Sequence, residues 1–174
     1  MADLLECLVQ IRALSETARQ FALLVSEASR PSFDRNSAQG LHALLDLVEG
    51  MARAEQLFAT SLRLILDQQG AVLPSEAPDV TASHTSTVIT STVVEPVLSA
   101  LERFTAWRTQ NLEVLASCSA DALSRIGIHR QRGGVTVADL VAHALARDTE
   151  QLGQLRQHLS SFAAHLPTPG DRDD

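Results

Sequence analysis

Apolar residues recur at steps of three and four through most of the chain, which is the spacing of one face of an α-helix. The clearest stretch runs from Thr136 to Gln157, TVADLVAHALARDTEQLGQLRQ, and predicts a helix that continues to about His165. Its apolar face consists of Val137, Leu140, Val141, Ala144, Leu145, Leu152, Leu155 and Leu159. Thr136 can cap this helix, and Asp139 three residues later completes a weaker form of the capping box.

The same periodicity predicts three further long helices. They span about Ala2 to Ser29, Ser37 to Gln69 and Glu95 to Ser117, and each is bounded by Pro, Gly or capping residues. A short helical turn is expected over 120–125. The segment 126–134, IGIHRQRGG, is interpreted as a loop that leads into the last helix.

The segment 71–94 breaks this pattern because it is rich in Thr, Ser and β-branched residues. Such residues favour strands, so a strand or hairpin is one possibility. Because no second convincing strand exists to pair with it, we interpret it as an extended crossover. The predicted fold is an all-α, antiparallel four-helix bundle over residues 1–166, with a long crossover between the second and third helices and a polar tail over 167–174.

Composition narrows the functions that this chain can have. With 174 residues, of which 45% are hydrophobic, the chain is long enough for one domain with a buried core. All 14 basic residues are arginine, which excludes lysine chemistry such as Schiff bases and phosphate-binding lysine loops. The net charge of -7 argues against nucleic acid as a general partner.

Cysteine usage and the lack of hydrophobic targeting segments indicate a cytoplasmic protein that does not interact with membranes. Cys7 and Cys118 are too few and too far apart to predict a disulfide framework or a zinc site. The first residues carry acids early and lack the pattern of a secretory signal. No apolar stretch approaches the length needed to span a bilayer.

Several short motifs in the second half follow one another in a specific order. FTAWRTQNLEVLA contains an aromatic-Arg-x-x-Asn-Leu sequence, RIGIH follows a short acidic turn, and GGVT opens a helix that ends in GQLR. Upstream, AEQLFATSLRLIL is followed by LPSEAPD. In order and spacing, these motifs resemble the DinB/YfiT-like family of four-helix bundles, over about Leu41 to Gln157. The resemblance implies the bundle fold and association as a homodimer. It also implies a divalent metal held by three histidines and used in thiol transfer or isomerisation.

The positions that correspond to the metal ligands of that family carry other residues here. With Glu55 aligned on the family's glutamate, Gly50 takes the place of the first histidine. With Asp148 aligned on the family's aspartate, Arg147 and Gln151 take the places of the other two. Glycine offers no ligand, arginine is a cation, and glutamine is a poor ligand for zinc or nickel. We therefore expect no metal and no catalytic residues.

A displaced metal site is the alternative. His143 lies one turn before Arg147 and could act with Asp139 or Asp46, or His42 could serve on the second helix. Such a site would bind a divalent metal such as zinc or nickel and support a thiol transferase or hydrolase. A lone histidine on a helix is more often structural or solvated.

Arg147 is the most informative of the replaced positions. Together with Gln151, His143 and Glu55, it could bind a small anionic ligand. Alternatively, it pairs with Glu55, Asp46 or Glu150 and fills the vacated site, which is the interpretation we favour. The predicted function is that of a non-catalytic structural or small-ligand-binding protein.

Overall fold

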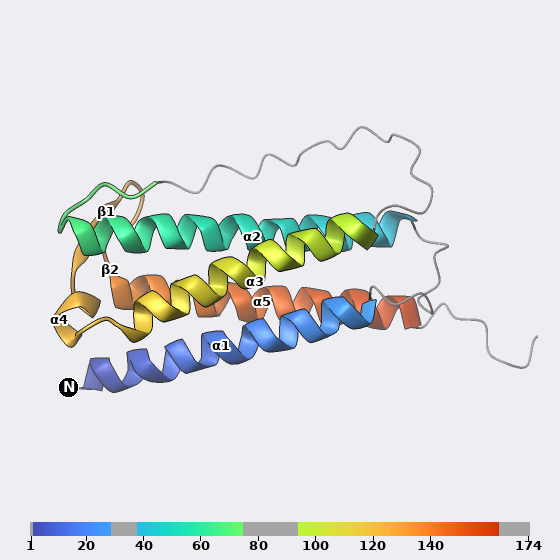
Figure 1. Cartoon of the computed structure of the whole chain (residues 1–174), viewed down its shortest axis with the longest axis horizontal. Coiled ribbons are helices and arrows are strands. Elements are labelled where there is room, and N and C mark those ends of the chain that lie inside the picture. Colours follow the sequence, from blue (N-terminus) through green and yellow to red (C-terminus); the bar gives the residue numbers. More distant parts are fainter. Residues whose placement is uncertain (1, 29–37, 75–93, 164–174) are drawn as a thin grey trace, which may run out of the picture.

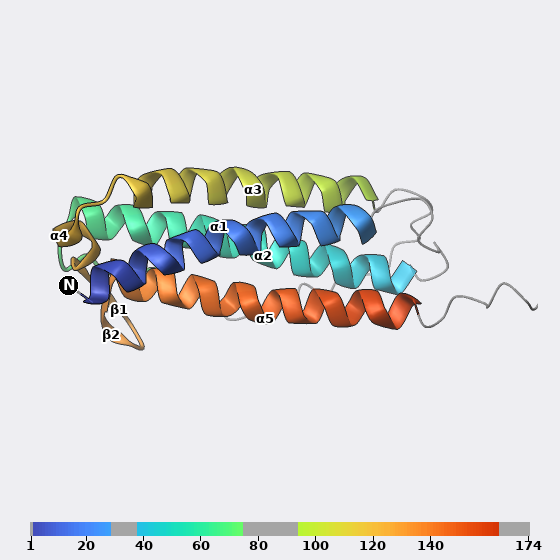
Figure 2. The ribbon, with the colours of Figure 1, turned by 90° about the horizontal axis from the view of Figure 1, so that it is seen from below.

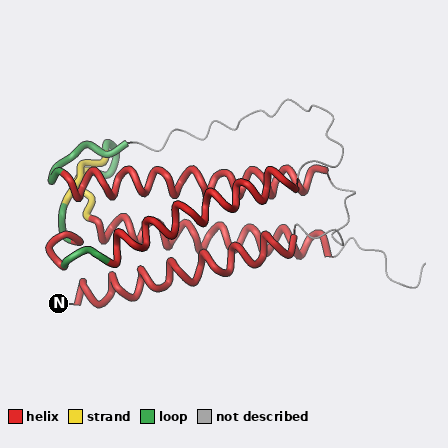
Figure 3. The backbone as a smooth tube through the Cα atoms, in the orientation of Figure 1, coloured by secondary structure: helices red, strands yellow, loops and turns green. Residues whose placement is uncertain are grey.

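The structure, a computed structural model, describes residues 2–28, 38–74 and 94–163. Within these ranges the chain is mostly helical (Figure 3), so the predicted all-α class is confirmed. The described elements are α1 (Ala2–Ala28), α2 (Ala38–Asp67), α3 (Val94–Ala116), α4 (Ala120–Leu123), β1 (Ile126–His129), β2 (Gly133–Thr136) and α5 (Val137–Ala163). No helix in the described ranges combines the length and the apolar composition that crossing a membrane requires.

The four long helices lie side by side, and the closest pairs are α2 with α3 and α1 with α5 (Figures 1 and 2). Contacts along α2 and α3 advance in the same direction. Arg103 reaches Glu49, and Arg108, further along α3, reaches Glu55, further along α2. The two helices are therefore parallel, and the predicted antiparallel arrangement is wrong for this pair.

The pair formed by α1 and α5 is also parallel. Thr17 contacts Asp148, and Gln20 contacts Arg156 further along both helices. The end of α2 and the start of α3 lie at opposite ends of the molecule (Figure 1). As a result, α3 runs in the same direction as α2, and α5, which follows α3, runs in the same direction as α1. Most of the predicted crossover 71–94 and all of the predicted tail 167–174 lie outside the described residues.

Two clusters of buried apolar residues form the core, one toward each end of the four helices. One cluster includes Phe21, Val48, Met51, Phe104 and Leu155, and the Phe21 and Phe104 rings lie 5.2 Å apart between centroids. The other includes Leu14, Leu62, Ile65, Leu115 and Val141. On each long helix, the residues of the two clusters are separated by a buried or half-buried polar position. These positions create a polar layer in the middle of the core.

The segment 126–134 was predicted as a loop, and this prediction is wrong. Ile126–His129 and Gly133–Thr136 pair in antiparallel register, and Val72 forms a parallel bridge to Ile128. Residue 127 is close to the end of α2, since a Cβ there would lie 2.7 Å from Cγ1 of Ile65. Only glycine fits this approach, so Gly127 allows the short sheet to pack against the end of α2.

The start of α5 confirms the predicted capping box. The backbone N–H of Asp139 donates to the hydroxyl of Thr136 at 3.0 Å, and the backbone N–H of Thr136 donates to the Asp139 carboxylate at 2.9 Å. This reciprocal pair satisfies N–H groups that the helix itself cannot bond. It fixes where α5 begins and hence which of its residues face the polar layer.

Candidate functional site

The polar layer between the two apolar clusters brings charged side chains from three helices together. Glu55 on α2 and Asp148 on α5 are each 1% exposed, and Arg108 on α3 is 3% exposed. We call the following six residues the buried ion-pair cluster: Thr17, Glu55, Arg108, Asn111, Arg147 and Asp148. Charged residues are rarely so buried unless they are paired, so the contacts within this cluster decide what it can do.

Arg108 lies at the centre of the cluster and uses all five of its N–H donors. Towards Glu55, Nε donates to Oε2 at 2.9 Å and Nη2 donates to Oε1 at 2.7 Å. Towards Asp148, Nη1 donates to Oδ2 at 2.6 Å and Nη2 donates to Oδ1 at 3.0 Å. The fifth donor goes from Nη1 to the backbone oxygen of Leu14 at 2.9 Å. One guanidinium therefore links α1, α2, α3 and α5.

The Glu55 carboxylate accepts two further hydrogen bonds. The Asn111 amide donates to Oε2 at 3.0 Å, and it also donates to the backbone oxygen of Glu55 at 3.1 Å. Nη2 of Arg147 donates to Oε1 at 3.2 Å. With Arg108, this gives each Glu55 oxygen two donors, which fills its capacity to accept.

Asp148 is held in a similar way from the opposite side of Arg108. The Thr17 hydroxyl donates to Oδ2 at 2.7 Å, in addition to the two bonds from Arg108. Thr17 lies on α1, between the apolar residues Leu14 and Phe21. Both buried carboxylates thus have hydrogen-bond donors for each oxygen.

The formal charges of the cluster sum to zero, because two carboxylates face two guanidinium groups. Burial lowers the pKa of Arg108, but hydrogen bonds from its guanidinium to Glu55 and Asp148 outweigh this, so its pKa lies above the ordinary value. Arg108 therefore remains a cation at neutral pH. Its guanidinium carbon also lies 5.2 Å from the centroid of the Phe104 ring, a cation–π arrangement.

Arg147 differs from the other charged members because it reaches the surface. Its side chain is 26% exposed, whereas that of Glu55 is 1% exposed. Of the pairings predicted for Arg147, the one with Glu55 is present. The Nε of Arg147 is buried and has no hydrogen-bond partner. One donor of the cluster is thus left without an acceptor.

The two remaining positions implied by the family resemblance carry no charge. Gly50 on α2 and Gln151 on α5 are both half-buried. A Cβ at Gly50 would meet no atom within 4 Å, so this position adjoins unfilled space. The three positions that the sequence analysis assigned to replaced metal ligands therefore carry a guanidinium at Arg147, an amide at Gln151 and no side chain at Gly50.

His143 and His42 are not brought together. His143 is exposed near the start of α5, and His42 is half-buried near the start of α2. These two helices run in opposite directions, so the two histidines lie toward opposite ends of the molecule (Figure 1). Within the described ranges, no three side chains of the types His, Cys, Asp and Glu form a group that could hold a metal ion.

Asp139, the carboxylate considered as a helper for His143, is engaged elsewhere. It accepts the backbone N–H and the hydroxyl of Thr136. These two bonds, with a smaller contribution from the nearby His143, hold the pKa of Asp139 below its ordinary value. The Asp139 carboxylate therefore stabilises the start of α5 as part of the helix cap.

The cysteines do not have the properties of nucleophiles. Burial raises the pKa of the Cys7 thiol, and the neighbouring Cys118 raises it further. Burial also raises the pKa of Cys118. A thiol that is protonated at neutral pH is a weak nucleophile, so this pair offers no obvious catalytic group.

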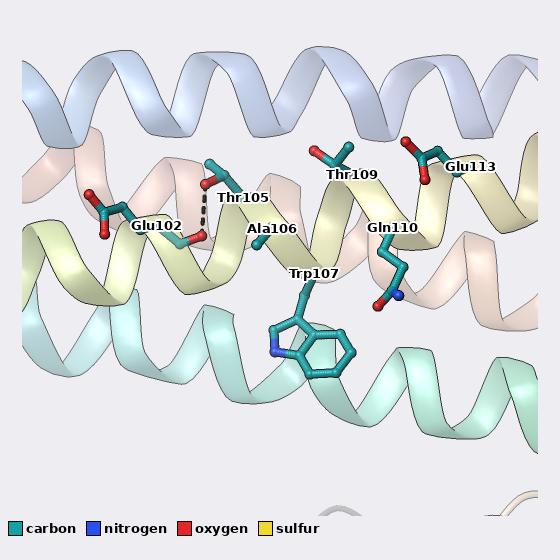
Figure 4. A pocket seen from close by; sticks show the side chains of 7 residues that line it. All are labelled: Glu102, Thr105, Ala106, Trp107, Thr109, Gln110 and Glu113. Atoms are coloured by element: carbon teal, nitrogen blue, oxygen red, sulfur yellow. Dashed lines mark hydrogen bonds between the residues drawn. The ribbon is translucent and has the colours of Figure 1, made fainter.

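Two surface hollows lie away from the cluster. A groove of about 730 Å³ runs along the outer side of α3, where Trp107 extends towards α2 (Figure 4). A second hollow of about 610 Å³ lies between the start of α1, α4 and the start of α5, with Cys7 and Asp139 among its lining residues. Neither is lined by Arg147, Gln151, His143 or Glu55.

Sequence reasoning identified Glu55 and Arg147 but overlooked Arg108, Asn111 and Thr17 as site residues. A signal for Arg108 was present, because it falls between Phe104 and Leu115 at helical spacing, on the buried face of α3. A charge inside an apolar stripe needs a buried partner of opposite charge. Glu55 and Asp148 occupy equivalent positions on their own helices, so the match could have been inferred.

Comparison with known proteins does not identify a relative. No protein-family model matches this sequence, and no curated protein matches it.

Proposed function

We propose that this protein is a non-catalytic four-helix bundle of the DinB-like kind, and that it binds a small anion beside Arg147. In this proposal the buried ion-pair cluster takes the place of a metal site, and residues 71–94 cross from one end of the bundle to the other. The resemblance assigns Gly50, Arg147 and Gln151 to the family's ligand positions, and the direct contact of Arg147 with Glu55 in the cluster supports the proposal.

The observation that carries the proposal is that the donors of Arg108 and the acceptors of Glu55 are all satisfied within the cluster. Arg108 has five filled donors, and each oxygen of Glu55 accepts two hydrogen bonds. A carboxylate that is saturated in this way, beside two permanent cations, is a poor ligand for a divalent metal. The cluster supports the fold and leaves no base or nucleophile poised for chemistry.

Arg147 is the part of the cluster that can still bind a partner. Its side chain is 26% exposed, and its buried Nε lacks an acceptor. Guanidinium groups recognise carboxylates and phosphates through paired hydrogen bonds. Gln151, one turn along the same face of α5, can add an amide donor. A small anion is therefore the ligand class that suits this position.

A thermal-shift titration of the full chain tests this proposal. Inorganic phosphate and acetate at about 10 mM should raise the Tm of the wild type, because a ligand that binds only the folded state stabilises it. Arg147→Met should abolish this rise. Arg53→Met, at an exposed arginine on α2, is the matched control and should retain it.

The same titration with zinc and nickel separates the alternatives. A rise in Tm at stoichiometric zinc or nickel that is lost in His143→Ala would overturn the metal-free proposal in favour of a displaced metal site. A wild type that responds to neither anions nor metals would overturn the ligand-binding part.

As its macromolecular partner we propose a second copy of the same chain. The resemblance to the DinB-like family implies a homodimer. Apolar side chains left exposed on α1, such as Leu5 and Val9, support the idea that part of this helix is covered in the assembled protein.

A further inference from the structure

The outer side of α1 carries a second, regular row of residues. We call it the outer α1 row, and it consists of Leu5, Val9, Arg12, Glu16, Arg19 and Leu23. The steps between them alternate between four and three residues, which is the spacing of the seam between two helices in a coiled coil. All six are exposed, and Leu5, Val9 and Leu23 are 68%, 61% and 54% exposed. The inner face of α1 is already used for the core, so this row has no partner within the described part of the chain.

Exposed apolar side chains are concentrated on α1. Half of the large apolar side chains that are exposed in the described ranges belong to this helix: Leu4, Leu5, Leu8, Val9 and Leu23. The other long helices contribute Leu64 from α2 and Leu98 from α3. Such a concentration on one helix is typical of a contact surface.

We propose that two copies of this chain associate through their outer α1 rows, antiparallel across a two-fold axis. The row is symmetric about the position of Leu14. In this arrangement Leu5 of one copy faces Leu23 of the other, and Arg12 faces Glu16. Each contact occurs twice, as a two-fold interface requires.

Charge selects the antiparallel arrangement over a parallel one. In a parallel pair in register, each Arg12 would face Arg12 of the second copy, and each Glu16 would face Glu16. Like charges that face each other disfavour association and so specify orientation. In the antiparallel pair, two Arg12–Glu16 contacts lie near the axis, and the apolar residues lie on either side of them.

The remaining contact pairs Val9 with Arg19 of the second copy. Arg19 already donates to Glu16 of its own helix through Nε at 3.1 Å and Nη2 at 2.9 Å. This contact holds its charged end beside the row, so its aliphatic stem can cover Val9. Each Glu16 thus faces Arg12 of the second copy and Arg19 of its own helix, while the apolar contacts lie toward the two ends of the row.

The interface is of modest size. From Leu5 to Leu23 the helix rises about 27 Å, which matches several turns of a helix–helix contact. Three apolar residues per copy place it at the low end of specific interfaces, so we expect association in the micromolar range. This arrangement rests on the homodimer proposed above and is independent of the anion proposal.

Sedimentation velocity on two charge-reversal variants tests the arrangement. Arg12→Glu places glutamate opposite glutamate, and Glu16→Arg places arginine opposite arginine. Each variant alone should dissociate about tenfold more readily than the wild type. An equimolar mixture restores both opposite-charge contacts and should form a heterodimer of near wild-type affinity. Arg53→Glu, on the exposed side of α2, is the control and should behave as the wild type.

The possible outcomes separate the surface from the homodimer itself. A wild type that is monomeric at about 100 µM, well above a micromolar dissociation constant, overturns both. A dimer that is indifferent to both reversals overturns the outer α1 row and leaves a homodimer through another surface. Weakening in each variant without rescue in the mixture overturns the antiparallel register. Circular dichroism spectra that match the wild type establish that each variant is folded.

Discussion

Arg108 and Glu55 form a two-point ion pair between α3 and α2, with N–O distances of 2.9 and 2.7 Å. The same guanidinium makes a second two-point contact with Asp148 on α5. A single side chain therefore neutralises two carboxylates that are each 1% exposed. Paired geometry of this kind is what makes a buried ion pair tolerable, and it makes Arg108 the residue on which the cluster depends most.

Arg108→Met should strongly destabilise the protein. The substitution keeps a similar volume but leaves Glu55 and Asp148 buried with Arg147 as their only cation. Removing one partner of a buried ion pair costs about 3 to 5 kcal/mol. Urea denaturation should show this as a lower free energy of unfolding. Arg103→Met, on the same helix with 55% side-chain exposure, should change it by less than about 0.5 kcal/mol. A loss below about 1 kcal/mol in Arg108→Met would contradict the central role of Arg108.

Arg147→Met should have a much smaller effect on stability. Glu55 keeps both contacts with Arg108 and its bond from Asn111, and the unsatisfied Nε is removed. We expect a change within about 1 kcal/mol, since the pair is partly exposed. In an Arg108→Met background the same substitution should cost more, because Arg147 is then the remaining cation of the cluster. Urea denaturation of both single variants and the double variant measures this coupling. Equal costs in the two backgrounds would show that the two arginines do not share Glu55.

Asp139→Asn should destabilise the protein in a pH-dependent way. The bonds from Thr136 hold the pKa of Asp139 below its ordinary value of 3.8. Its charge therefore stabilises the fold fully above the unfolded pKa, and this contribution is lost as the pH falls through the folded pKa. At pH 7 the cost should be about 0.5 to 1 kcal/mol, the usual value of a cap.

Urea denaturation from neutral pH down to about pH 3 measures how this cost changes, since the relevant titration lies below the ordinary aspartate pKa. The difference between Asp139→Asn and the wild type should shrink as the pH falls. Glu113→Gln, at an exposed carboxylate far from a helix start, should show no such trend. A constant difference at every pH would mean that the charge of Asp139 does not contribute to the cap.

Two glycine-to-alanine substitutions should act in opposite directions. A Cβ at Gly127 would lie 2.7 Å from Ile65 and 2.8 Å from Leu73, so Gly127→Ala should cost about 1 to 3 kcal/mol. A Cβ at Gly153, on the exposed side of α5, would meet nothing within 4 Å. Gly153→Ala should therefore stabilise the protein by up to about 1 kcal/mol through helix propensity. Thermal denaturation measures both changes. A Gly127→Ala variant that is as stable as the wild type would contradict the close packing of β1 against α2, and a destabilised Gly153→Ala variant would contradict the open site on α5.

The sequence predicts the helices well because their apolar periodicity is long and uninterrupted. The Thr136–Asp139 cap was equally readable, since it depends on neighbouring residues. The relative direction of neighbouring helices could not be predicted, because an apolar stripe looks the same whichever way the neighbouring helix runs. The hairpin at 126–136 was missed because its strands are only four residues long and glycines interrupt their pattern.

The site was predictable only in part. Glu55 and Arg147 were identified through the positions of a family motif, and their pairing is present. Arg108 was overlooked although it stands inside an apolar stripe. Its role depends on bringing α2, α3 and α5 together, with partners 53 and 40 residues away in the chain. The local sequence pattern cannot show which carboxylates pair with Arg108 until the neighbours of each helix are known.

The parallel pairing of α2 with α3, and of α1 with α5, also has a consequence for how fast this chain folds. Neighbouring helices in a bundle with short connections make contacts between residues close in sequence. Here the parallel helices α2 and α3 cannot make contacts next to a short turn, and Glu55 must find Arg108, which lies 53 residues away. Proteins whose contacts span long stretches of chain fold more slowly, because the entropy of closing large loops is lost before the contacts form. This protein should therefore fold more slowly than an up-and-down bundle built from the same four helices.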